Sequence, residues 1–253
     1  MIINKQHHEL LLSYYKEQYM KLPHGRIETH RGKPVIALIY DPNDPEVTSR
    51  HTRRFVLTSK NGQFYQKLIE ESSDIKRKID ELTDKWNNTY KGLPQTIHFP
   101  LKKRSATGIS TKTYLNSLPN QNPREYDNEI IYKDQRLRSK NELIVCQALD
   151  KMGYEYKTEI IINTNEYYSF APDLTYYIKE LEKPVAMEID GAMDKEGYFD
   201  KAEDRKRYYI KNGYKEFKDV VFFRLNEGKS FDYDRLEAVI QSTILVNLND
   251  IIT

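Results

Sequence analysis

The stretch that decides the fold is Phe170-Ala171-Pro172-Asp173-Leu174-Thr175-Tyr176-Tyr177-Ile178, followed by a charged turn over 179–183 and by Val185-Ala186-Met187-Glu188-Ile189-Asp190-Gly191. Two apolar runs joined by a short turn predict two neighbouring strands. Such a pair would carry Asp173 and Glu188 to the same end of the sheet. Two carboxylates held side by side repel each other, and a divalent cation with oxygen ligands is the usual means of keeping both ionised. The stretch therefore predicts the outline of a metal site.

The elements around this stretch predict an α/β sandwich. A helix with a buried apolar stripe precedes it and stops at Gly153. The remaining elements are read from apolar periodicity as a strand over Tyr154–Ile162, a charged helix over Phe199–Asn212, a buried strand over Val220–Leu225 and an amphipathic helix over Leu236–Leu248. The order helix, three strands, helix, strand, helix makes a sheet that is covered on both faces.

The chain before this region is expected to form a smaller N-terminal α+β module over residues 1–92. Its expected elements are a short helix that ends before Pro23, a β-hairpin with strands Arg26–Thr29 and Pro34–Tyr40, a third strand over Arg53–Thr58, and a long amphipathic helix over Gln63–Tyr90 with an interruption allowed at Ser72-Ser73. Residues 93–135 have four prolines and little periodicity, which indicates a linker or an extended arm. The last part, 136–253, carries the α/β sandwich.

Composition limits the classes of function. The net charge of +2 over 253 residues is close to neutral, so affinity for nucleic acid has to come from local patches. One such patch is Lys102-Lys103-Arg104 in the arm, which either lies along phosphates or belongs to a solvated tether. The single cysteine, Cys146, excludes an intramolecular disulfide and a cysteine-based zinc cluster. Without a signal-peptide pattern or a run of membrane-spanning length, a cytoplasmic location and no membrane contact are expected.

Four pieces of sequence, in this order, resemble the PD-(D/E)xK nuclease superfamily, which has the restriction-endonuclease-like fold. The pieces are Arg138-Ser139-Lys140-Asn141-Glu142, then Pro172-Asp173, then Glu188-Ile189-Asp190-Gly191, and a helix from Tyr198 to Gly213. The set is similar to a bacterial and mobile-element subgroup with an Arg-Ser-Lys-x-Glu helix, a Glu-x-x-Gly-x-Met-Asp stretch and a Tyr- and Lys-bearing helix ending in Asn-Gly. Those positions are filled here by Glu188, Gly191, Met193, Asp194, Tyr198, Tyr209, Asn212 and Gly213.

The resemblance implies a mixed sheet flanked by helices and a magnesium-dependent DNA endonuclease of a defence, restriction or mobile-element system. It implies that Asp173, Glu188 and the carbonyl of Ile189 hold Mg²⁺, with Mn²⁺ as a substitute. Glu142 would approach through a water or as a direct ligand. Hydrolysis of a phosphodiester needs an activated water and neutralisation of transition-state charge, and a bound metal supplies both. Arg138 and Lys140 are either contacts to DNA phosphates or a solvated face.

The sequence departs from the superfamily pattern at the position of the motif lysine. The lysine of the standard motif stands two residues after the second acid, and Asp190 occupies that position here. A basic residue from the next helix is the expected replacement, and Lys201 and Arg205, four residues apart on one helical face, are candidates together with Lys206. Arginine stabilises transition-state charge but is a poor proton carrier.

This departure leaves three hypotheses open. The first is a metal-dependent endonuclease that uses Arg205 or Lys201. The second is a catalytically inactive protein of nuclease fold that binds or inhibits nucleic acid. The third is a structural interaction protein of a phage or mobile element whose long N-terminal helix pairs with a partner. The N-terminal module is a candidate contact surface for DNA, for a second copy of the chain, or for a partner protein.

Overall fold

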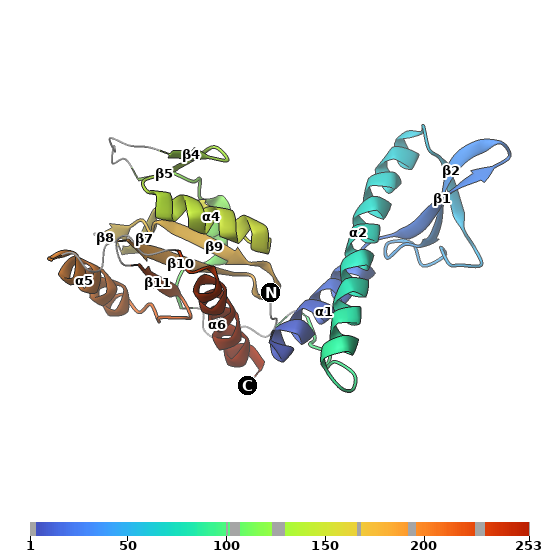
Figure 1. Cartoon of the computed structure of the whole chain (residues 1–253). Coiled ribbons are helices and arrows are strands. Elements are labelled where there is room, and N and C mark those ends of the chain that lie inside the picture. The colour runs from blue at the N-terminus through green and yellow to red at the C-terminus, as the bar shows by residue number, and fades with distance from the viewer. Residues whose placement is uncertain are drawn as a thin grey trace. The chain divides into compact units, whose positions relative to one another are not determined.

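The computed structural model describes residues 4–99, 101, 107–122, 130–165, 168–191, 196–225 and 231–252, and it has a mixed α/β architecture. The chain divides into two compact units (Figure 1). The N-terminal unit spans Ile3–Pro100, and the C-terminal unit comprises Leu101–Thr253 together with Met1–Ile2.

The N-terminal unit consists of two helices and a three-stranded antiparallel sheet of order β1-β2-β3. Its elements are α1 (Lys5–Met20), β1 (His24–His30), β2 (Lys33–Tyr40), β3 (Arg53–Val56) and α2 (Lys60–Thr89). Both helices have a side-chain N-cap, since Asn4 accepts a hydrogen bond from the backbone of Gln6 and Ser59 accepts one from Gly62. α2 runs through Ser72 without a break, and the buried Ser72 hydroxyl donates to the carbonyl of Ile69 within the helix.

Two apolar clusters hold this unit together, and α2 contributes to both. Leu12 of α1 packs with Leu82 and Trp86 of α2. Further along α2, Ile69 packs on one face of the sheet, against a cluster that also contains Ile36, Leu38 and Val47. The amphipathic pattern of the long helix is thus used along its length, first against the sheet and then against α1.

The C-terminal unit is built on a four-stranded sheet of order β11-β10-β9-β6, in which β10 and β11 are parallel and the other neighbours are antiparallel. The sheet strands are β6 (Glu155–Thr158), β9 (Leu174–Ile178), β10 (Lys183–Asp190) and β11 (Val220–Arg224). Its helices are α3 (Thr111–Asn116), α4 (Lys140–Met152), the 3-10 turn η1 (Lys179–Leu181), α5 (Tyr198–Lys211) and α6 (Tyr233–Ile252). Two small hairpins complete it, namely β4 (Ile130–Tyr132) with β5 (Gln135–Leu137), and β7 (Ile162–Asn165) with β8 (Tyr168–Phe170).

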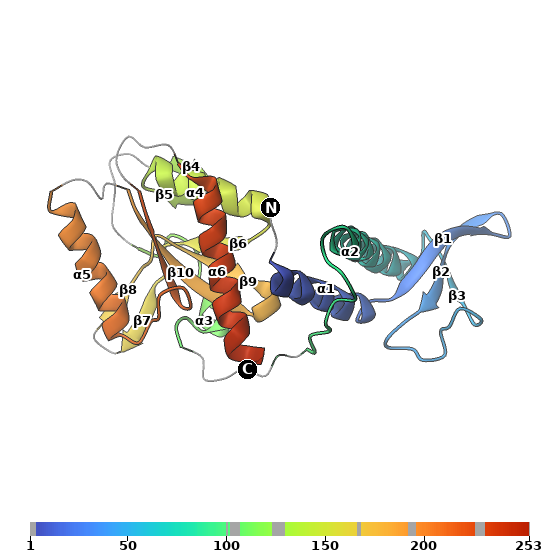
Figure 2. The same ribbon diagram turned by 60° about the horizontal axis from the view of Figure 1, so that its bottom comes forward.

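Helices cover both faces of this sheet (Figure 2). The adjacent residues Phe222 and Phe223 of β11 point to opposite faces, as the pleat requires. The ring of Phe222 contacts Tyr209 of α5, with 5.6 Å between ring centroids. On the other face, the guanidinium of Arg235 in α6 lies 5.5 Å from the ring of Phe223. The predicted succession of helix, three sheet strands, helix, strand and helix is present as α4, β6, β9, β10, α5, β11 and α6.

Two parts of the C-terminal unit differ from the sequence prediction. The predicted strand Tyr154–Ile162 ends at Thr158, because Glu159 adopts a left-handed conformation with φ of 45°, and Ile162 belongs to the separate β7–β8 hairpin. The stretch 93–135, expected as a linker or an extended arm, contains α3 and β4. Ile109 and Tyr114 of this stretch are buried in an apolar cluster with Tyr209 and Phe222. Prolines and low periodicity hid these contacts, since α3 is too short to show a helical repeat.

Candidate active site

The antiparallel pairing of β9 with β10 brings Asp173 and Glu188 to one end of the sheet. The paired ladder ends at Met187 opposite Leu174, so Asp173 and Glu188 are the next residues outward on the two strands. There, Oδ2 of Asp173 accepts a hydrogen bond of 2.8 Å from the backbone N–H of Ile189. A side chain thus continues the ladder where the strand pairing stops. The N–H and C=O of one extended residue face the same neighbour, so the carbonyl of Ile189 also faces the Asp173 side.

Asp173 and Glu188 both line a cavity of about 420 Å³. The other described residues of its wall are Asn122, Arg138, Ile161, Ser169, Phe170, Ala171, Arg205, Tyr208 and Tyr209. Two buried carboxyl groups and two arginines therefore share one cavity with aromatic rings. This composition suits an anionic ligand with flat, apolar parts, because the arginines meet the charge and the rings offer stacking surface.

Burial dominates the protonation chemistry of the two acids. Asp173 is 8% exposed and Glu188 is 3% exposed. Burial raises the pKa of Asp173 above its usual value. Burial, and then repulsion by the Asp173 charge, raise the pKa of Glu188 well above its usual value. The hydroxyl of Tyr209 opposes this effect by donating a 2.5 Å hydrogen bond to Oε1 of Glu188.

Arg205 reaches the acids from α5. Its Nη2 lies 2.6 Å from Oδ1 of Asp190, and its Nη1 lies 3.6 Å from Oε2 of Glu188. Asp190 is fully buried, and its Oδ2 has Nε of Arg224 at 3.8 Å. Burial raises the pKa of Asp190 although two arginines act in the opposite direction. Asp190, which stands at the position of the motif lysine, thus pairs with Arg205, which is a candidate to replace that lysine.

Glu142 stands at the start of α4 and caps it together with Ser139, in a variant of the capping box in which the carboxylate accepts from the residue before the N-cap. Oε2 of Glu142 accepts a hydrogen bond of 2.8 Å from the backbone N–H of Arg138, and Oε1 accepts one of 3.0 Å from the Ser139 hydroxyl. The Ser139 oxygen in turn accepts the backbone N–H of Glu142. Burial, followed by repulsion from Asp173, raises the pKa of Glu142 to about 7. The charge of Asp173 therefore affects the pKa of Glu142, while both Glu142 oxygens accept hydrogen bonds at the start of α4.

Arg138 is held by an acid that the sequence did not single out. Its guanidinium pairs with the carboxylate of Glu159 and lies 3.8 Å from Oδ1 of Asp173. Glu159 is 2% exposed and also accepts a 3.0 Å hydrogen bond from the side-chain amide of Asn122. Its left-handed backbone, costly for a residue other than glycine, turns the chain so that the carboxylate meets Arg138. The contact between Tyr209 and Glu188 was likewise not foreseen, although the resemblance had singled out Tyr209.

The other residues singled out from the sequence lie away from this cavity or outside the described residues. Lys140 and Lys201 are exposed and are not part of the described cavity wall. Lys206 pairs with Glu216 at 2.6 Å. Lys102, Lys103, Arg104, Met193 and Asp194 lie outside the described residues. Of the three expected basic candidates on α5, the structure brings Arg205 to the acids, leaves Lys201 at the surface and pairs Lys206 with Glu216.

The donor chemistry of the cavity fits a hard divalent cation. Mg²⁺ is commonly bound by one or two carboxylates and keeps several waters, and Asp173 with Glu188 offers such a pair. Among the described residues, no three Asp, Glu, His or Cys side chains are arranged so that they alone would hold an ion. Glu142 is the third acid in question, and both of its oxygens accept hydrogen bonds at the start of α4. The fit therefore rests on Asp173, Glu188 and the Ile189 carbonyl.

No family model matches the chain, and neither a curated protein nor a solved structure matches it. In the described part of the chain, no helix combines the length and the apolar character needed to cross a bilayer.

Proposed function

We propose that this chain is a magnesium-dependent DNA endonuclease of the restriction-endonuclease-like fold. The observation that carries the proposal is the convergence of Asp173 and Glu188, from two antiparallel strands, on a cavity that also holds two arginines. The mixed sheet with helices on both faces supports the same proposal, since it follows the order of elements read from the sequence. The resemblance of the ordered motifs supplies the link from this site to phosphodiester hydrolysis.

In this proposal Asp173, Glu188 and the carbonyl of Ile189 hold the Mg²⁺ ion. The ion, when bound, lowers the pKa of a water and neutralises charge on the phosphate. Glu142 orients the start of α4 through its capping hydrogen bonds and adds negative charge close to Asp173. Tyr209 keeps Oε1 of Glu188 in place through its short hydrogen bond, so Oε2 would be the oxygen available to hold the ion.

In this proposal Arg205 and Arg138 replace the missing lysine in stabilising negative charge on the phosphate. Arg205 lies beside Glu188, and Asp190 fixes its guanidinium by a 2.6 Å contact. A guanidinium held in this way presents N–H groups to phosphate oxygens without needing to lose a proton. Arg138 stands on the Asp173 side of the cavity, where Glu159 holds it. Proton transfer from the attacking water would then have to go to solvent or to a carboxylate, because arginine is a poor proton carrier.

A second candidate function is a catalytically inactive protein of the same fold that binds nucleic acid. The observation that favours it is the pairing of the site's acids with arginines, since Asp190 and Glu188 both face Arg205 and Asp173 faces Arg138. Such pairs neutralise the acids without a metal ion. Both candidates need the same cavity and differ in whether a phosphodiester bond is broken.

The test compares nicking of supercoiled plasmid DNA by the wild-type chain, by Glu188→Gln and by Glu155→Gln, with Mg²⁺, with Mn²⁺ and with EDTA. Glu155 is the matched control, because it is an exposed glutamate of β6 in the same unit. Endonuclease function requires metal-dependent nicking that Glu155→Gln retains and Glu188→Gln loses. DNA binding by all three proteins with no nicking in any metal would select the inactive protein. Equal nicking by wild type and Glu188→Gln would contradict the assignment of the site.

A further inference from the structure

The strands of the N-terminal sheet carry many more positive than negative side chains. Its three strands and the turn between β1 and β2 carry five cations, Arg26, Arg31, Lys33, Arg53 and Arg54, against the single acid Glu28. The long helix α2, by contrast, is balanced: it has the six cations Lys60, Lys67, Lys76, Arg77, Lys78 and Lys85 and the six acids Glu70, Glu71, Asp74, Asp80, Glu81 and Asp84. Positive charge in this unit is therefore concentrated on the sheet.

The strand register shows which face of the sheet carries this charge. Arg26 pairs with Ala37, and Ala37 pairs with Arg54, so these three residues form one row across the sheet. The neighbours of Ala37 along β2, Ile36 and Leu38, point to the opposite face and pack in the cluster with α2. Because side chains alternate along a strand, the row of two arginines lies on the face turned away from α2.

Glu28 organises the two arginines and leaves the face positive. Its Oε2 accepts a 2.9 Å hydrogen bond from Nε of Arg26, and its Oε1 accepts one of 2.8 Å from Nε of Arg54. These bonds lower the pKa of Glu28, so the carboxylate stays ionised and offsets one of the two positive charges. The arginine side chains remain 67% and 38% exposed. Arg53, on the other face, is engaged by Asp44 and Glu46 and does not add to this surface.

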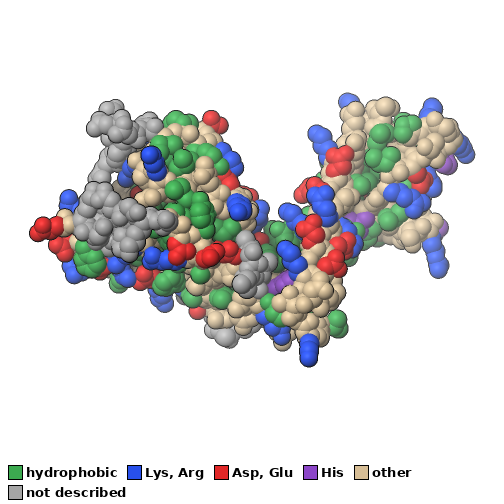
Figure 3. Space-filling model, viewed as in Figure 1, with side chains coloured by type: hydrophobic (Ala, Val, Ile, Leu, Met, Phe, Trp, Pro, Cys, Tyr) green, Lys and Arg blue, Asp and Glu red, His purple; other side chains and the backbone are tan. Residues whose placement is uncertain are grey.

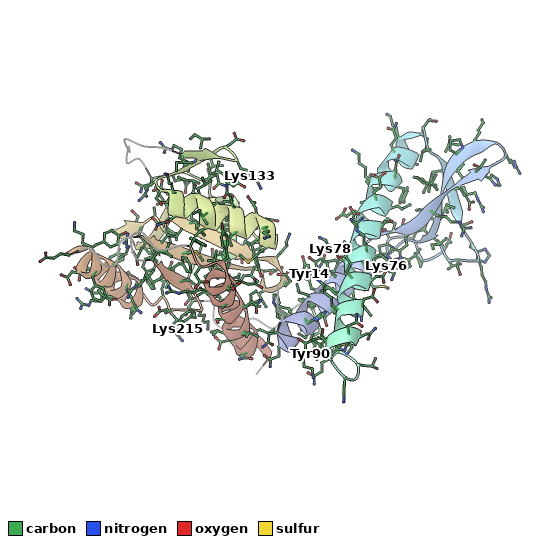
Figure 4. All side chains as sticks on the ribbon, viewed as in Figure 1. Tyr14, Lys76, Lys78, Tyr90, Lys133 and Lys215 are labelled. Carbon is green, nitrogen blue, oxygen red and sulfur yellow. The ribbon has the colours of Figure 1, made fainter. Side chains whose placement is uncertain are left out.

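The hairpin that joins β1 and β2 adds two more cations at its end. Arg31 and Gly32 form a two-residue turn with φ of 51° and 74°, which are the positive angles of a type I′ turn. Arg31, Lys33 and His30 are all exposed there. Figure 3 shows Lys and Arg side chains over this end of the hairpin. Two cations of α2, Lys76 and Lys78 (Figure 4), have partners within the unit. Lys76 pairs with Asp80, and Lys78 lies 5.2 Å from the ring of Tyr15.

We propose that the outer face of this sheet and the tip of the β1–β2 hairpin, defined by Arg26, Arg31, Lys33 and Arg54, bind the phosphate backbone of duplex DNA. A two-stranded ribbon is of a size that enters the major groove, and cations on its face and tip then meet phosphates along the groove edges. Charge complementarity selects a polyanion as the partner, since the face offers cations held in a fixed row. The inference goes beyond cleavage and does not depend on it, because the surface belongs to the unit that lacks the acidic cavity.

The experiment measures the affinity of the full-length chain for a fluorescein-labelled 30-base-pair duplex in EDTA, as a function of KCl concentration. The hairpin variant is Arg31→Asn with Lys33→Gln. Asn-Gly is a preferred pair for a type I′ turn, so this variant removes two charges while favouring the same hairpin. The control variant is Lys67→Gln with Lys85→Gln, which removes the same charge from exposed positions of α2. Fluorescence of Trp86, the single tryptophan, reports whether the N-terminal unit of each variant is folded.

The hairpin variant is expected to bind about tenfold more weakly near 0.1 M salt, and its slope of log affinity against log salt is expected to fall by about 2. The α2 control is expected to keep its affinity within about twofold, since its charges are not in contact with phosphate. Equal losses in the two variants, or no loss in either, would overturn the proposal. Competition by poly-glutamate as effective as that by unlabelled duplex would also overturn it, because it would point to an acidic protein as the partner. Failure of plasmid nicking leaves this result unaffected, so the two proposals fail separately.

Discussion

Replacing Glu142 by glutamine should remove a large part of the pH dependence of stability in the C-terminal unit. Burial and the Asp173 charge raise the pKa of Glu142 to about 7, whereas the ordinary value is 4.5. A group whose folded pKa is raised contributes stability that is fully present below the unfolded pKa and is lost as the pH rises through the folded pKa. At 1.36 kcal/mol for each pH unit between the two values, the wild type loses about 3 kcal/mol between pH 4.5 and pH 8 through this carboxyl alone.

Glutamine has the same shape and no charge to bury. Its carbonyl can accept the N–H of Arg138, and its amide can donate to the Ser139 oxygen, so the capping box is retained. The free energy of unfolding is measured by urea titration from pH 4 to pH 8, with far-UV circular dichroism for the whole chain. Trp86 fluorescence serves as an internal control, because this residue lies in the other unit and should not respond. The variant should be close to wild type at pH 4 and more stable by about 2–3 kcal/mol at pH 8. Parallel curves for the two proteins would refute the claim that Glu142 is a buried, repelled carboxyl.

Three further substitutions test other contacts. Arg205→Met should destabilise the C-terminal unit by about 2 kcal/mol, because it leaves Asp190 buried without its 2.6 Å partner. Adding Asp190→Asn to that variant should restore at least about 1 kcal/mol, and a double-mutant cycle in urea measures this recovery. Lys183→Met should lower the free energy of unfolding by about 3 kcal/mol in the same assay, since the fully buried Asp219 loses its 2.6 Å ion pair. An unchanged urea midpoint would mean that the pair contributes nothing to stability. Gly62→Ala should lower the free energy of unfolding, followed by Trp86 fluorescence, by about 2 kcal/mol. The reason is that the added Cβ would lie 2.1 Å from the carbonyl oxygen of Val56. A gain in stability would instead show that the higher helix propensity of alanine outweighs this clash.

The main elements of both units could be read from the sequence because each has a strong local signal. The apolar runs of β9 and β10, the Gly153 stop of α4 and the long repeat of α2 are visible without any tertiary information. What could not be read depends on contacts between distant segments. Tyr114 is an unremarkable aromatic residue in a proline-rich stretch, and only the packed structure shows that it is 2% exposed. Glu159 adopts a left-handed backbone that its residue type gives no reason to expect.

The candidate site shows the same division. Asp173 and Glu188 could be paired from the sequence, because an antiparallel turn fixes which residues meet. The choice between Lys201 and Arg205 could not be made, since the two lie four residues apart on one helical face. Arg205 and Tyr209 contact the acids, whereas Lys201, one turn nearer the start of α5, is exposed. Only the packed structure shows which turn of α5 lies beside Glu188 and Asp190.

The charges around the end of β10 do not balance among the buried groups described. Five buried carboxyl groups, those of Glu142, Glu159, Asp173, Glu188 and Asp190, stand against the arginines Arg138, Arg205 and Arg224. If all these groups were ionised, an excess of two negative charges would remain in a poorly solvated place. Burial and mutual repulsion oppose this state, and they raise the pKa values of Glu142, Asp173, Glu188 and Asp190. Protons and a divalent cation are alternative ways of neutralising this excess, and at Asp173 and Glu188 they would compete for the same oxygens. The mutual repulsion that opposes ionisation of Asp173 and Glu188 would therefore also favour binding of Mg²⁺ between them in the proposed nuclease.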